Sequence, residues 1–88
     1  MKTLVKQFFK FEDEILQSGA VVEGTVIVMG NKVVTINNGK VKLGEDSFSF
    51  STYTDPSGKM ILNLSGIASD INGSAYIEEF VRAVENGL

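Results

Sequence analysis

The stretch from residue 20 to residue 65 most constrains the fold, because it is rich in Val, Ile, Thr and Phe and is interrupted by turn residues. Gly30-Asn31 and Asn38-Gly39 each fit the two-residue loop of a β-hairpin. Residues 44–47 and 54–58 supply two longer turns, and the second of these contains the chain's one proline. Four reversals predict five antiparallel strands that follow one another as a meander.

Side-chain alternation agrees with these turns. Pairing residue 27 with 34, 36 with 41, 43 with 48 and 50 with 62 gathers one apolar face, since a slip of one residue would send side chains to the opposite side. The predicted core face consists of Ile27, Val34, Ile36, Val41, Leu43, Phe48, Phe50, Met60, Leu62 and Leu64. The opposite face is apolar at a valine patch made of Val26, Val28, Val33 and Thr35.

Amphipathic patterns predict a helix on each side of this region. Within residues 2–18, Leu4, Phe8, Phe11 and Ile15 recur at helical spacing. Residues 75–86 carry a narrower apolar stripe. The predicted architecture is therefore α+β: a five-stranded antiparallel β-meander flanked by an N-terminal and a C-terminal α-helix. The 88 residues are expected to form a single domain, residues 1–88.

The charges of the first predicted helix run against its dipole. Its lysines lie near the positive end and its acids near the negative end, so packing must hold this helix or the charges must serve recognition. Lys2, Lys6 and Lys10 form a basic ridge, which is the place where nucleic acid would bind in an alternative interpretation. A net charge of −3 makes nucleic acid the weaker candidate.

The chain contains no cysteine and no histidine. It therefore lacks a thiolate nucleophile, the commonest general base and the commonest metal ligand. No other arrangement of residues indicates catalysis, so we expect no enzymatic activity, no cofactor and no metal site. The charged N-terminal residues do not resemble a signal peptide, and no apolar run is long enough to span a membrane. We expect a cytoplasmic protein.

The apolar arc of residues 2–18 is about 160° wide, more than a single core usually takes. This excess predicts a small non-enzymatic protein-interaction domain, which associates with itself or binds and inhibits a partner protein, as small proteins of phages and mobile elements do. A small-molecule site between helix and sheet is a further alternative. Glu12 lies within the apolar arc, so either this edge is exposed or Glu12 meets a cation on a partner. The candidate interface residues are Val5, Phe9, Glu12, Leu16, Val26, Val28 and Val33.

Overall fold

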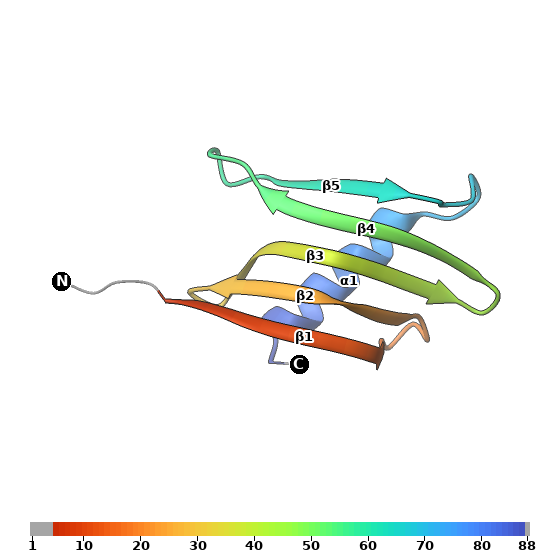
Figure 1. Ribbon diagram of the computed structural model, residues 1–88, viewed down its shortest axis with the longest axis horizontal. Coiled ribbons are helices and arrows are strands. Elements are labelled where there is room, and N and C mark those ends of the chain that lie inside the picture. Colours follow the sequence, from red (N-terminus) through yellow and green to blue (C-terminus); the bar gives the residue numbers. More distant parts are fainter. Residues whose placement is uncertain (1–4, 88) are drawn as a thin grey trace.

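The computed structural model describes residues 5–87 as two layers, a five-stranded sheet with one helix against one face (Figure 1). The strands are antiparallel and lie in the order of the sequence, from β1 at one edge to β5 at the other. We call the face that contacts the helix the inner face and the opposite one the outer face. The elements are β1 Lys6–Ile15, β2 Val21–Met29, β3 Lys32–Leu43, β4 Asp46–Thr54, β5 Met60–Ser65 and α1 Gly73–Glu85.

The structure has five antiparallel strands and the predicted C-terminal helix, but the predicted N-terminal helix is wrong. Residues 6–15 form the edge strand β1, which pairs with β2 from Lys6 opposite Met29 to Ile15 opposite Val21. The apolar residues of this segment are three or four positions apart, and that spacing predicts one stripe on a helix. In the strand they divide between the faces, with Phe8 on the outer face and Phe11 on the inner one.

Asn38-Gly39 is not a hairpin loop either, because β3 continues through it from Lys32 to Leu43. The dipeptide forms a bulge, at which the registers with β2 and with β4 both shift. Asn38 takes the left-handed conformation, with φ 54°, that a turn would also have required. Two predicted strands are therefore one, and the total remains five because β1 replaces the predicted helix.

The core lies between the inner face and α1. Ile36, Val41, Phe48 and Phe50 are buried as predicted, and Leu43, Met60, Leu62 and Leu64 pack against them half-buried. Ile27 and Val34 are not in this core. Val26, Val28 and Val33 of the predicted valine patch are buried on the inner face instead, and only Thr35 lies on the outer face. The strand bulges change which residues point inward, and the simple alternation did not include them.

Two residues of α1, Ile77 and Phe80, are completely buried on the sheet. Phe80 meets Phe11 of β1 edge to face, with ring centroids 5.4 Å apart. In Figure 1 the helix crosses behind the strands from the β5 side to the β1 side. One helix therefore covers the centre of the inner face and leaves its margins half-buried.

Two glutamates of α1 fasten the helix to the loop after β1 and to the backbone of β3. The Glu79 carboxylate accepts hydrogen bonds from the Ser18 backbone N–H at 3.0 Å and from the Ser18 hydroxyl at 2.6 Å. Glu85 accepts one from the Val33 N–H at 2.9 Å, beside the bulge at Val34. Side chains thus satisfy backbone donors near irregular parts of the sheet.

Threonines of β4 form hydrogen bonds with backbone groups in the irregular part of β3. The buried Thr52 hydroxyl accepts a hydrogen bond from the Ile36 N–H at 3.0 Å. The Thr54 hydroxyl donates to the Val34 carbonyl at 2.8 Å. In the described part of the chain, every buried side-chain nitrogen and oxygen has a hydrogen-bond partner.

The turn between β4 and β5 is organised by Asp55. Its carboxylate accepts hydrogen bonds from the Ser57 hydroxyl at 2.6 Å and from the Lys59 N–H at 2.9 Å. These bonds, the Ser57 hydroxyl first, lower the pKa of Asp55 below its ordinary value, since they stabilise the charged carboxylate.

Candidate functional site

The outward edge of β1 is the most distinctive surface of the molecule. β1 pairs with β2 on one side, and no described strand pairs with its other side. Four of the five large hydrophobic residues that are most exposed lie on or beside this strand: Val5 at 73%, Ile15 at 71%, Phe8 at 65% and Phe9 at 42%. Exposed apolar side chains beside unpaired backbone groups are typical of a surface that accepts another strand.

The backbone groups that point to this edge can be identified from the pairing. Successive strand residues direct their N–H and C=O groups to opposite sides. Met29 and Lys32 flank the two-residue loop between β2 and β3, so the groups of Met29 face β3. Lys6 lies opposite Met29 and therefore directs its own groups outward. Phe8 and Lys10 share this orientation, which leaves the backbone N–H and C=O groups of three residues for a partner strand.

Charge is divided along the same edge. Lys6 and Lys10 occupy its first part, whereas Glu12, Asp13 and Glu14 follow directly. Lys10 Nζ lies 3.2 Å from Glu12 Oε1, and both side chains are largely exposed. Since these residues are two positions apart in the strand, the contact places Glu12 on the outer face with Lys10.

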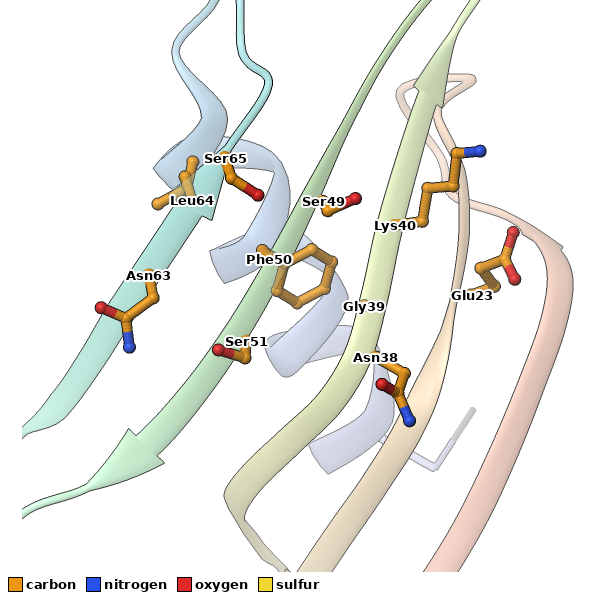
Figure 2. A pocket seen from close by; sticks show the side chains of 10 residues that line it. All are labelled: Glu23, Asn38, Gly39, Lys40, Ser49, Phe50, Ser51, Asn63, Leu64 and Ser65. Atoms are coloured by element: carbon orange, nitrogen blue, oxygen red, sulfur yellow. The ribbon is translucent and has the colours of Figure 1, made fainter.

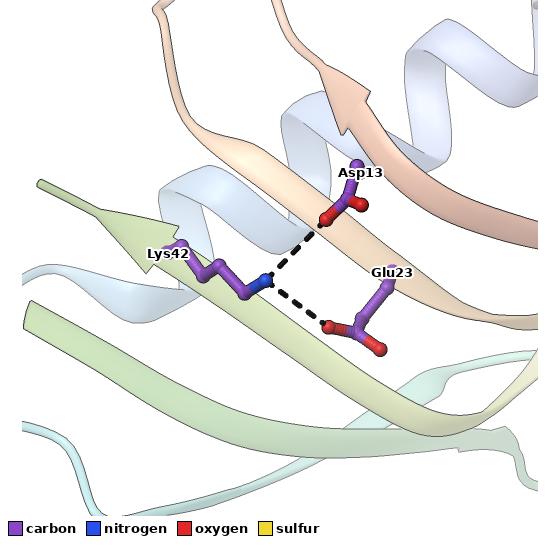
Figure 3. Close-up of polar contacts among 3 residues, drawn as sticks. All are labelled: Asp13, Glu23 and Lys42. Atoms are coloured by element: carbon purple, nitrogen blue, oxygen red, sulfur yellow. Dashed lines mark hydrogen bonds and ion pairs between the residues drawn. The ribbon is translucent and has the colours of Figure 1, made fainter.

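A bulge ends the regular part of β1. Residues 12 and 13 together oppose Glu23 of β2, and Asp13 has a φ of 49°. Figure 3 shows Lys42 of β3 between two carboxylates, with its Nζ 3.3 Å from Asp13 and 3.7 Å from Glu23. The straight segment of the edge runs from Lys6 to the start of the bulge at Glu12.

The structure separates the predicted interface residues into two groups. Val5, Phe9 and Glu12 are exposed on or beside β1. The other four, Leu16, Val26, Val28 and Val33, are buried in the core beneath α1 and form no accessible surface. For the alternative nucleic-acid ridge, Lys6 and Lys10 share the outer face of β1 and are exposed, and Lys2 lies outside the described residues.

The sequence interpretation missed an apolar row across the outer face. Successive pairings align residues of all five strands, from the exposed Phe8 of β1 to the half-buried Ile61 of β5. Finding this row required both a strand at residues 6–15 and the bulge at Val34, which aligns Ile27 with Thr35. The row consists of Phe8, Ile27, Thr35, Tyr53 and Ile61.

A polar hollow lies beside this row, above the Asn38-Gly39 bulge (Figure 2). Its volume is about 490 Å³, and small side chains such as Ser49 and Ser51 leave the surface low there. A larger hollow of about 650 Å³ lies between α1 and the loop after β1, next to Glu79. Neither contains a buried polar group without a partner, so neither shows the unsatisfied groups that would indicate a ligand.

Within residues 5–87, no three acidic side chains come together as they would to hold a metal ion. The same part of the chain has no helix of the length and apolarity needed to cross a membrane. Two lysines of the outer face pair with acids: Lys42 with Asp13 and Glu23, and Lys10 with Glu12. This mixed charge favours contact with protein over contact with phosphate.

Comparison with known proteins provides no family for the chain. No family model matches it, and we found no curated protein or solved structure with significant similarity. What the protein does must therefore be inferred from the geometry of its own surfaces.

Proposed function

We propose that this protein is a small non-enzymatic interaction domain, which binds a partner protein or a second copy of itself by adding a strand to the free edge of β1. The observation that carries the proposal is the exposure of Phe8, Phe9 and Ile15 along an edge whose outward backbone groups have no described partner. Strand addition supplies affinity through main-chain hydrogen bonds, and side chains on both faces add specificity. A cytoplasmic location and inhibition of a partner stay predictions.

The other edge of the sheet offers a natural comparison. β5 is six residues long against ten for β1. None of its residues is among the exposed large hydrophobics. A short edge strand is a common protection against unwanted pairing, and β1 is not short.

Photo-crosslinking in cells that produce the protein tests this proposal. A benzophenone amino acid replaces Phe8 on β1 or, as the matched control, Ile61 on β5. We expect adducts of defined mass from position 8 and few from position 61. Lys10→Pro should abolish them, because proline removes an outward N–H without breaking the ladder to β2. Lys10→Ala removes the same charge but keeps the N–H, so its adducts should persist.

Equal adducts from both positions would contradict the proposal. So would adducts from position 8 that survive Lys10→Pro, since the contact would then not depend on the strand edge. The mass of the adduct distinguishes a second copy from another protein.

A further inference from the structure

We infer that the strand added to β1 is the β1 of a second copy, antiparallel to the first and related to it by a two-fold axis through Phe9. The inference rests on the proposed function and specifies its partner. The charges along the edge of β1 complement the same charges in reverse order, as a second, antiparallel copy presents them.

Geometry restricts how two copies of this edge can pair. Residues opposite each other in an antiparallel pair share a face, so a symmetric pairing that continues the sheet must join residues of the same parity. A two-fold axis at Phe8 places Lys6 opposite Lys10, and an axis at Lys10 places that lysine opposite itself. Like charges directly opposite each other destabilise a sheet. The axis at Phe9 avoids both.

With the axis at Phe9, no two like charges of the straight segment lie opposite each other. Lys6 lies opposite Glu12 of the second copy, and Phe8 lies opposite Lys10 of the second copy. Phe9 lies opposite the Phe9 of the second copy on the inner face. The outward backbone groups of Phe8 and Lys10 then pair with each other across the axis. Each Glu12 lies between two ammonium groups, its own Lys10 at 3.2 Å and the Lys6 of the second copy.

The bulge at residues 12 and 13 sets the length of this contact. Bulges and lysines normally protect an edge strand from pairing. Residues 6–12 are centred on Phe9 and form the self-complementary segment. The bulge begins at Glu12, where this segment ends. In this pairing Lys6 of each copy meets Glu12 of the other, so the charge that would discourage an unrelated strand favours a second copy.

Reversing one charge in each of two variants tests the pairing. Lys6→Glu places glutamate opposite Glu12, and Glu12→Lys places lysine opposite Lys6. Each variant alone should dimerise about tenfold more weakly than the wild type, since two attractive pairs become two repulsive ones. An equimolar mixture should recover the wild-type affinity within about threefold, because both pairs in the mixed dimer are attractive. Lys59→Glu, in the turn before β5, makes the same change in net charge as Lys6→Glu and should leave dimerisation unchanged.

Sedimentation equilibrium measures these affinities from the mass, which should rise toward twice 9.5 kDa at high micromolar concentration. The altered side chains are exposed, and matching circular dichroism spectra confirm that each variant is folded. A wild type that stays monomeric, or a mixture no tighter than the separate variants, would overturn the inference. If the protein is monomeric and position 8 crosslinks to another protein, the self-pairing inference is wrong, but the proposed function as a strand-accepting interaction domain is supported.

Disulfide trapping tests the register separately. The chain contains no cysteine, so Phe8→Cys, Phe9→Cys and Lys10→Cys each introduce a single thiol. Only Phe9 is opposite itself, at a non-hydrogen-bonded pair where Cα atoms are about 4.5 Å apart, which a disulfide can span. Oxidation should therefore link Phe9→Cys fastest. Faster linkage at position 8 or 10 would overturn the axis at Phe9.

Discussion

Replacing Gly39 by alanine should destabilise the protein by steric conflict inside the sheet. Gly39 of β3 lies opposite Phe50 of β4, and both point to the inner face. A methyl group at Gly39 would lie 2.5 Å from Cζ of the Phe50 ring. Non-bonded carbons prefer about 3.5–4.0 Å, so the ring would have to move by about 1 Å in a packed core. Gly39 is not among the residues with positive φ, so backbone strain does not contribute.

Overpacking of this kind costs about 1–3 kcal/mol of unfolding free energy. In a domain of this size, that loss lowers the melting temperature by about 5–20 °C. Phe50→Leu removes the ring and should relieve the conflict, so that Gly39→Ala costs less than about 1 kcal/mol in that background. A coupling energy of about 1–2 kcal/mol between the two positions is therefore expected.

Urea unfolding of the four proteins in this cycle, at low micromolar concentration, measures the coupling. The control is Gly44→Ala, because a methyl group there would meet no atom within 4 Å and Gly44 has a φ of 65°. Its cost should be that of left-handed backbone, about 1 kcal/mol, and should not depend on Phe50. A tolerated Gly39→Ala, or an equal cost in both backgrounds, would refute the packing of Phe50 on Gly39.

Three further changes test the core and one turn. Thr52→Val should cost about 1–3 kcal/mol, because it leaves the buried Ile36 N–H without an acceptor, and chemical denaturation should show that Thr52→Ser costs less. Phe80→Ala should cost about 3–5 kcal/mol, against about 1 kcal/mol or less for the half-exposed Tyr53→Ala, as measured by thermal unfolding. Folding lowers the pKa of Asp55, so its carboxylate stabilises the protein above pH 3.8 and this contribution is lost as the pH falls through the folded pKa. Unfolding midpoints of the wild type and Asp55→Asn should therefore differ at pH 7 and converge near pH 2, and a constant difference would contradict this linkage.

Much of the sheet could be predicted because its strands are bounded by strong turn residues. Gly30-Asn31 does form the two-residue loop between β2 and β3. Asn38-Gly39 has the same composition but lies within β3, since the left-handed conformation of Asn38 serves a bulge as well as a turn. A local preference for positive φ does not reveal whether the chain reverses, because strand pairing decides that.

The candidate site could be predicted only in part, because β1 is an edge strand. Its pairing and faces are less restricted by burial than those of a central strand, so Phe8-Phe9 and Glu12-Asp13 break the alternation of apolar and polar residues. Helical spacing then fitted residues 2–18 by coincidence. One signal was present: lysines at the start and acids at the end oppose a helix dipole but do not conflict with a strand.

The contacts of α1 have a consequence for the order in which the molecule assembles. Every strand pairs with its neighbour in the sequence, whereas the hydrogen bonds that Glu79 accepts from Ser18 and Glu85 accepts from Val33 join residues 61 and 52 positions apart. Closing a long loop costs more entropy than closing a hairpin, so the hairpins can form before the helix docks. Until the helix docks, the valines and phenylalanines of the inner face are exposed to water. The rate of helix docking therefore sets how long a newly made chain is most prone to aggregate.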